Sequence, residues 1–206
     1  MKKMSVIISL LVVVLVLFFA VEPCLSQAVK DEFLGYRFRT KQVQNDIKIF
    51  ACRYNVDQEA WWTVKVDNPL VDGKWYNWDT KLRREIVEFT MPSGPNIPCD
   101  PSEDPPAGFT GVVQGDGIIF GPFSLIPDAA EGGVWEGTWK LQYVQDGEGL
   151  LTAQAKGHGG LLEGKSLHVF TRYPYPRPTR CACPICPATG SNMCMDGWVL
   201  TPASVE

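Results

Sequence analysis

Histidine is scarce in this chain, with His158 and His168 the only two among 206 residues. The sequence holds no HExxH motif, no serine, histidine and aspartate in a hydrolase order, and no glycine-rich loop of the kind that cradles phosphates. It therefore gives no support to a zinc protease, a triad hydrolase or a P-loop enzyme. His158 lies in a glycine turn, which favours a solvated side chain over a catalytic base.

Basic residues are not in excess either. The chain carries 19 lysines and arginines against 23 aspartates and glutamates, a formal net charge of −4. Removing residues 1–26, which include Lys2, Lys3 and Glu22, leaves 17 basic and 22 acidic residues and a net charge of about −5. Such a protein lacks the positive surface that attracts nucleic acid or anionic membranes. We expect neither as a partner.

Long apolar runs are confined to the first residues. A pair of lysines precedes an apolar stretch, Val6–Ala20, and small residues follow Pro23. This order predicts a secretory signal peptide over residues 1–26, and so a protein that is secreted, periplasmic or held at the cell surface. Two alternatives stay open. The stretch is close to the ~17 residues that a spanning helix needs, so it could be retained as an anchor, and Cys24 could carry a lipid.

The cysteine pattern fits export. Without Cys24, six cysteines remain: Cys52, Cys99, Cys181, Cys183, Cys186 and Cys194. An even number in an exported chain predicts disulfides, and Cys52 and Cys99 are expected to pair either with each other or with the C-terminal group. The alternative is a zinc or iron centre built from the four clustered thiols. Their spacing matches no common site and includes no histidine, so we expect disulfides and no metal or other cofactor.

The stretch Gly133–Phe170 is typical of three β-strands joined by two glycine-rich turns. Side chains alternate between the two faces of a strand, so the first strand places large aromatics on one face and mostly polar residues on the other. The aromatic face carries Trp135, Trp139 and Tyr143, which we expect to be buried and which are the candidate ligand-binding residues. Alanines on the next strand leave room opposite the tryptophans.

Further short strands are predicted on both sides of a proline-rich segment. Phe33–Thr40 alternates three apolar side chains with Arg37 and Arg39. Leu82–Met91 could form a strand or a short helix, and its β-branched and aromatic end favours a strand. Outside the signal peptide, little of the chain has a helical pattern.

Proline and glycine mark the boundaries between these strands. Pro92–Ala107 contains six prolines and predicts a loop, since proline cannot donate to a sheet ladder. Gly115-Asp116-Gly117 predicts the turn of a hairpin. The expected divisions are a signal peptide (1–26), a β-domain (27–172), and a proline-rich connector with a cysteine-rich tail (173–206).

The count of roughly seven to nine short strands predicts an all-β domain. We expect an antiparallel barrel of about eight strands, or alternatively a β-sandwich, followed by the cysteine-rich C-terminal tail. Closure into a barrel would remove the exposed edges that make short apolar strands prone to association.

One segment also resembles a known family. GVWEGTW at residues 133–139 is followed, after a hairpin, by the pattern Gly157-x-Gly159-Gly160-Leu-x-Glu163-Gly164. Together they resemble the secreted bacterial relatives of the allene oxide cyclase and dirigent barrel group, over about residues 108–170. The resemblance implies an eight-stranded antiparallel barrel. It transfers no catalytic residue, because no matching acid or base position can be identified.

Three classes of function stay open. The aromatic strand favours an exported barrel that binds a small apolar or aromatic ligand without catalysis. By analogy of fold, the second is a cyclase or isomerase that shapes its substrate, with Glu136 and Glu163 as acid and base if both faced the interior. Glu136 faces away from the tryptophans, which favours a surface role for it. The third is a disulfide-stabilised surface protein that binds other proteins.

Overall fold

The structure, a computed structural model, describes residues 28–143, 148–174 and 193–203. Its compact unit spans Lys30–Thr201. The predicted signal peptide, the turn at Asp146-Gly147 and the cysteines from Cys181 to Cys186 lie outside the described residues.

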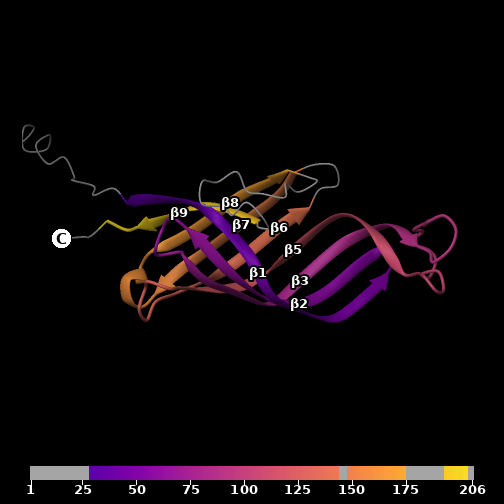
Figure 1. Ribbon diagram of the computed structural model, residues 1–206, viewed down its shortest axis with the longest axis horizontal. Coiled ribbons are helices and arrows are strands. Elements are labelled where there is room, and N and C mark those ends of the chain that lie inside the picture. The colour runs from indigo at the N-terminus through magenta and orange to yellow at the C-terminus, as the bar shows by residue number, and fades with distance from the viewer. Residues whose placement is uncertain (1–27, 144–147, 175–192, 204–206) are drawn as a thin grey trace, which may run out of the picture. The chain divides into compact units, whose positions relative to one another are not determined.

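The described strands form one antiparallel sheet of nine strands. Eight of them close into a ring in the order β2-β1-β9-β8-β7-β6-β5-β3, because β2 also pairs with β3 (Figure 1). The ninth, β4 (Ile97–Pro98), pairs only with the end of β3 among the described residues. One closed ring confirms the predicted all-β, barrel-like fold rather than a sandwich of two sheets. The strands of the ring are β1 (Val29–Phe50), β2 (Arg53–Val66), β3 (Gly73–Thr90), β5 (Gly111–Pro127), β6 (Val134–Tyr143), β7 (Glu148–His158), β8 (Ser166–Pro174) and β9 (Met193–Thr201).

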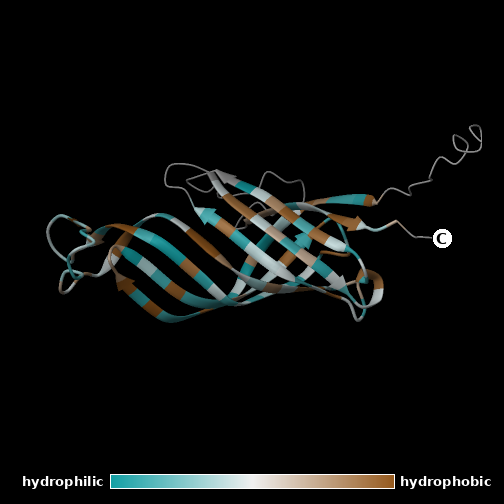
Figure 2. Ribbon diagram, turned by 180° about the vertical axis from the view of Figure 1, so that it is seen from behind, coloured by the Kyte–Doolittle hydropathy of each residue, from teal (hydrophilic) through white to brown (hydrophobic). Residues whose placement is uncertain are grey.

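Alternation along the strands separates the inside of the ring from the outside (Figure 2). On β6, Trp135 and Trp139 are buried, whereas Glu136 between them is exposed. Trp139 lies directly opposite Gly121 on β5 and Ala153 on β7. Small residues on both neighbouring strands leave the volume that the indole ring fills. The predicted burial of this aromatic face is confirmed for both tryptophans.

Four strands continue beyond the ring. Among the described residues, β5 pairs with β6 only from Gly117 to Leu125, whereas its pairing with β3 runs on to Gly111. The β1–β2 hairpin likewise extends to Phe50 and Arg53. Figure 1 shows β1, β2, β3 and β5 projecting past the other strands. We call this four-stranded part the extension.

A disulfide holds the far end of the extension together. Cys52 lies in the two-residue turn of the β1–β2 hairpin and is bonded to Cys99, just after β4, with a Cα–Cα distance of 5.7 Å. Backbone hydrogen bonds flank the bridge: Cys99 donates to the carbonyl of Val87, and Ile86 donates to the carbonyl of Cys52. This confirms one of the two predicted arrangements for Cys52 and Cys99, in which they pair with each other.

The prediction of a hairpin at Gly115-Asp116-Gly117 is wrong, because β5 runs through these residues without a turn. Gly117 pairs with Arg84 on one side and Tyr143 on the other. A Cβ atom at Gly117 would lie 2.6 Å from the carbonyl oxygen of Arg83, closer than real contacts allow. This glycine therefore permits a close approach of two strands rather than a reversal of the chain.

The ring also extends past residue 172, where the sequence placed its end. β8 runs to Pro174, and β9 lies between β8 and β1 and so completes the closure. Met195 and Val199 of β9 are fully buried. The alternation of buried and less buried residues in β9 is short and lies close to cysteines and prolines. The sequence pattern therefore does not predict a strand there.

The third strand of the predicted meander begins later than expected. A 3-10 turn, η1 (Gly160–Leu162), occupies the start of the segment, and β8 starts at Ser166. Gly159, Gly160 and Gly164 all have positive φ, which this turn needs. The three strands themselves are confirmed.

Candidate functional site

A cavity of about 490 Å³ lies inside the ring. Its lining comes from β1, β2, β3, β5, β6 and β9, which places it between opposite walls of the ring. This volume is typical of small-molecule sites. Most of the apolar wall is formed by Trp62, Leu82, Ile119, Trp139, Leu141 and Tyr143.

Arg37 of β1 contributes a buried charge to this cavity. Its side chain is 0 % exposed, and it shares the inner face of β1 with the buried Phe33. The sequence pattern sets Arg37 and Arg39 against the apolar residues of this strand, and the structure places Arg37 in the interior. The Nη2 atom of Arg37 donates to the sulfur of Met193 at 3.8 Å.

Three indole rings surround the guanidinium group. The Cζ atom of Arg37 lies 4.5 Å from the ring centroid of Trp62, 5.2 Å from that of Trp75 and 5.4 Å from that of Trp139. These distances are within the range of cation–π attraction, which is strongest for tryptophan and increases when water is excluded. Aromatic faces from β2, β3 and β6 therefore help to hold a positive charge within the ring.

The indole N–H groups of the inner tryptophans differ in their hydrogen bonds. Trp62 donates to Oδ1 of Asn77 at 3.1 Å, and Trp135 donates to the carbonyl of Leu70 at 2.6 Å. The Nε1 atoms of Trp75 and Trp139 are buried and find no acceptor among the described residues. A buried donor without an acceptor is costly and needs an explanation. Of these two tryptophans, Trp139 lines the cavity.

Polar side chains of β1 and β2 line another part of the cavity. Arg39 donates to Oε1 of Gln42, and Nε2 of Gln42 donates to Oε1 of Gln58 at 2.6 Å. Gln58 is only 6 % exposed, so this short chain of hydrogen bonds leads from the surface to the interior. The lining residues that the structure describes include two arginines and no carboxylate.

The structure brings together two of the three residues that the sequence proposed for ligand binding. Trp139 and Tyr143 line the cavity. Trp135 lies on the same face of β6 but is packed away from the cavity, with its N–H bonded to the chain after β2. Tyr143 also lies under the guanidinium of Arg84, 4.7 Å from its ring centroid.

Sequence reasoning missed the contribution of three other strands to the site. Arg37 on β1, Trp62 on β2 and Met193 on β9 all reach the cavity, although they are far apart in the chain. Within Gln58–Asp67, alternation puts Trp62 on the same strand face as Val64 and Val66, and this is the signal that could have found it. No local signal marks Arg37, because its environment is made by other strands.

The side chains considered for acid–base chemistry lie outside the cavity. Glu136 and Glu163 are exposed, and Glu163 accepts a hydrogen bond from the backbone N–H of Gly159. His158 is exposed as predicted. His168 stacks on Trp198 on the outside of the sheet, where burial and the nearby Lys156 lower the pKa of its imidazole. None of these side chains lines the cavity.

The cysteine predictions are only partly covered by the structure. Besides the Cys52–Cys99 bridge, Cys194 is disulfide-bonded. Within the described residues, no group of three histidine, cysteine, aspartate or glutamate side chains could hold a metal ion. No helix in that part of the chain is long and apolar enough to cross a membrane.

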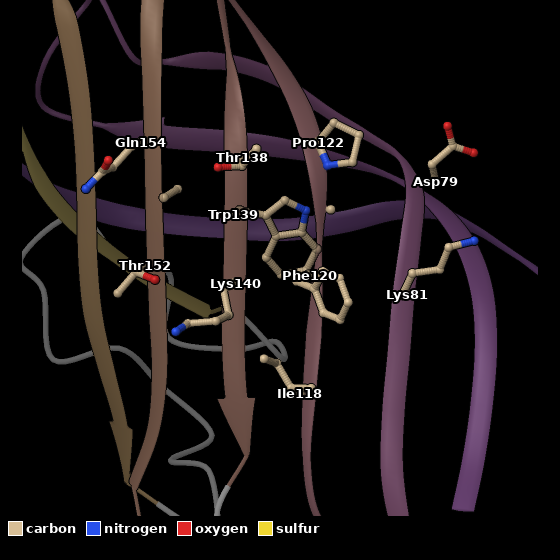
Figure 3. A pocket seen from close by; sticks show the side chains of 12 residues that line it. Asp79, Lys81, Ile118, Phe120, Pro122, Thr138, Trp139, Lys140, Thr152 and Gln154 are labelled. Atoms are coloured by element: carbon tan, nitrogen blue, oxygen red, sulfur yellow. The ribbon is translucent and has the colours of Figure 1, made fainter.

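A second concavity lies on the outside of the sheet. It measures about 680 Å³, and Figure 3 shows side chains of β5, β6 and β7 around it. Thr138, Lys140 and Gln154 alternate along their strands with the buried Trp139 and Ala153, so they belong to the outer face. Lys81 and Asp79 of β3 also line this outer groove, and Trp139 lines both the groove and the cavity.

An aromatic row also follows the outside of β2 and β3. Trp61 stacks on Tyr76 with ring centroids 4.8 Å apart, and Tyr76 stacks on Trp78 at 5.6 Å, both with interplanar angles of 26°. Lys41 lies 4.7 Å from the ring of Trp61. Sugar platforms present the faces of their rings to solvent, whereas stacked rings cover one another. The row is therefore better explained as cross-strand packing.

Comparison with protein-family models, with curated proteins and with solved structures found no match for this chain. The resemblance to the allene oxide cyclase and dirigent group therefore stays a prediction. The assignment of function depends on the geometry of the cavity.

Proposed function

We propose that this protein is exported and binds a small apolar or aromatic ligand inside the ring without converting it. The observation that carries the proposal is the cavity of about 490 Å³ with Trp62 and Trp139 in its wall. A ligand placed there would contact aromatic and aliphatic side chains from opposite strands, which remove apolar ligand surface from water, and would meet arginine and glutamine side chains on the remaining wall.

Binding is favoured over catalysis by the chemistry of the lining. General acid–base catalysis most often uses histidine, glutamate or aspartate within hydrogen-bond reach of the substrate. The lining residues that the structure describes include none of these. Glu136 and Glu163, the candidate acid and base, are exposed outside the ring. A cyclase that acts through them would need a different site.

Export is supported by the covalent structure of the extension. The Cys52–Cys99 disulfide joins residues separated by 47 positions in the sequence. Disulfides of this structural kind persist in oxidising compartments and are rare in the cytosol. Together with the predicted signal peptide, this supports a binding protein that works outside the cytoplasm.

Native mass spectrometry of protein purified from secreted material tests the proposal. We expect a small noncovalent adduct that is lost on denaturation. Ala60 lines the cavity and is 2 % exposed, so Ala60→Phe fills the space and should reduce the adduct. A matched control is Thr138→Phe, which adds the same ring to the outer groove. Protein that carries no adduct and binds no apolar compound would contradict the proposal, as would an adduct reduced only by the control variant.

A further inference from the structure

Arg39, Gln42 and Gln58 form a chain of hydrogen bonds whose direction is set at one end. A guanidinium group has donors and no acceptor, so Arg39 must face the oxygen of the Gln42 amide. The amide nitrogen of Gln42 is then turned toward Gln58 and donates to its Oε1 atom at 2.6 Å. The oxygen of the Gln58 amide is therefore engaged by the protein, and the N–H groups of its Nε2 atom are left for another partner.

These N–H groups of Gln58 are open to the cavity. Within the part of the chain that the structure describes, Nε2 of Gln58 donates to no acceptor. Unlike the indole nitrogens of Trp75 and Trp139, it is not enclosed by protein atoms. Gln58 lines the cavity and is 6 % exposed, so the space that reaches this nitrogen is the cavity itself. An acceptor on a ligand would complete the chain.

A second chain of hydrogen bonds inside the ring ends differently. Trp62 donates to Asn77, whose Nδ2 atom donates to Oγ1 of Thr80 at 3.2 Å. Thr80 donates in turn to the backbone carbonyl of Trp78 at 3.3 Å. This second chain begins at a donor and ends at an acceptor, and both belong to the protein. The chain from Arg39 begins and ends at donors, so among the described residues it lacks a final acceptor, which a molecule in the cavity would supply.

We propose that the ligand is an aromatic carbonyl compound, bound with its carbonyl oxygen accepting a hydrogen bond from Nε2 of Gln58. A carbonyl supplies an acceptor and no donor, whereas a hydroxyl would bring a donor that meets an oxygen already engaged. Ala60 and Trp62 follow Gln58 along β2, and all three line the cavity. The small Ala60 leaves room for the ring of the ligand to pack against Trp62. The inference rests on the proposed binding function and adds the chemical class of the ligand.

A ketone and the matching alkene test the inference. 2-Acetylnaphthalene and 2-isopropenylnaphthalene have nearly the same shape, and only the ketone has a carbonyl oxygen; acetophenone and α-methylstyrene form a smaller pair. Because the alkene is the more apolar compound, the quantity to compare is the ratio of the two Kd values in wild type and in Gln58→Met. Isothermal titration should show that this variant loses roughly threefold to tenfold of the preference for the ketone, the range for one neutral hydrogen bond.

A matched control separates the cavity from the outer groove. Gln154 is exposed and lines the outer groove, so Gln154→Met makes the same substitution outside the ring and should leave the ratio unchanged. Circular dichroism and thermal melting identify the variants that are folded. If Gln58→Met does not fold, Gln58→Leu removes the same donor with a different side chain.

Arg39 is a positioning residue in this arrangement, because it acts on the ligand through the amides of Gln42 and Gln58. Arg39→Lys keeps a donor, so the preference for the ketone should persist. Arg39→Glu supplies an acceptor, which turns the Gln42 amide and then the Gln58 amide, so that Oε1 of Gln58 faces the cavity. The ketone preference should then fall as in Gln58→Met, while 2-naphthol, a hydroxyl donor, should bind several-fold more tightly than it binds the wild type. A purely structural role of Arg39 would not reverse the preference between acceptor and donor.

The outcomes separate the two proposals. The same ratio in wild type and in folded Gln58→Met would overturn the inference and leave the binding function standing. A ketone preference that survives in folded Arg39→Glu would overturn the directed chain. A ratio changed only by Gln154→Met would place the ligand in the outer groove and overturn both proposals. Binding of none of these compounds, by protein that also lacks a natural adduct, would overturn both as well.

Discussion

The guanidinium group of Arg37 lies 4.5 Å from the centre of the Trp62 ring, and both side chains line the cavity inside the ring. The two residues come from neighbouring strands, β1 and β2, and they place a permanent charge beside an apolar wall. Cation–π contact with the indole ring offsets part of the cost of removing this charge from water. Together the two residues give the cavity a polar side and an apolar side.

The first prediction concerns the wall of the cavity. Trp139 is 3 % exposed, and truncating a buried tryptophan to alanine leaves a large void. Trp139→Ala is therefore expected to lower the free energy of unfolding by about 3–5 kcal/mol, measured by urea denaturation. Trp61→Ala is the control, because Trp61 is only partly buried in the outer row and should lose about 1 kcal/mol. A loss below about 1 kcal/mol for Trp139→Ala would contradict its burial.

The second prediction concerns the bridge in the extension. In the chain-entropy description, a disulfide that closes a loop of 47 residues contributes about 4 kcal/mol. The double variant Cys52→Ala with Cys99→Ala should lose close to that free energy of unfolding and melt at a lower temperature. Thiol titration of unreduced wild-type protein in denaturant should detect no free thiol. A double variant as stable as the wild type would show that the extension is held by its strand pairing alone.

The sequence predicts a structural feature best when that feature depends on residues that are close together in the chain. The burial of Trp135 and Trp139 followed from alternation within one strand, and the meander followed from glycine turns close to it. The closure of the ring was suggested by the number of strands, and pairing of Cys52 with Cys99 was one of two arrangements left open. Burial and the meander depend on patterns that are a few residues long. The disulfide was expected because an exported chain enters an oxidising compartment.

The missed features depend on contacts between distant segments. Arg37 alternates with apolar residues and so had the pattern of a surface arginine, but three tryptophans from other strands make the interior its environment. Gly117 had the pattern of a turn, but its lack of a side chain lets β5 approach the backbone of Arg83. Neither the cage of indoles nor the close approach of two strands is visible in a short stretch of sequence.

The third prediction is a pH dependence at β9. Burial raises the pKa of the Asp196 carboxyl above its usual value of 3.8, and this outweighs the hydrogen bonds that lower it. The folded protein thus favours the protonated form, so the contribution of this group to stability is complete below pH 3.8 and is lost as the pH rises through the folded pKa. Asp196→Asn stays neutral at every pH.

We therefore expect Asp196→Asn to be more stable than the wild type near neutral pH and to lose this advantage on acidification. Urea denaturation of both proteins across an acid-to-neutral series would measure the difference. Asp57→Asn is a suitable control, because Asp57 forms an exposed ion pair with Lys81, at 2.7 Å, and such pairs contribute little. A constant difference between wild type and Asp196→Asn across the series would rule out titration of this carboxyl as its source.

The most direct test of the central claim is a crystal structure of the protein purified from its natural secreted source, without added ligand. The account predicts electron density for a small molecule inside the ring, in contact with Trp62 and Trp139. A cavity that is filled by the protein's own side chains, or that holds only ordered water, would contradict it.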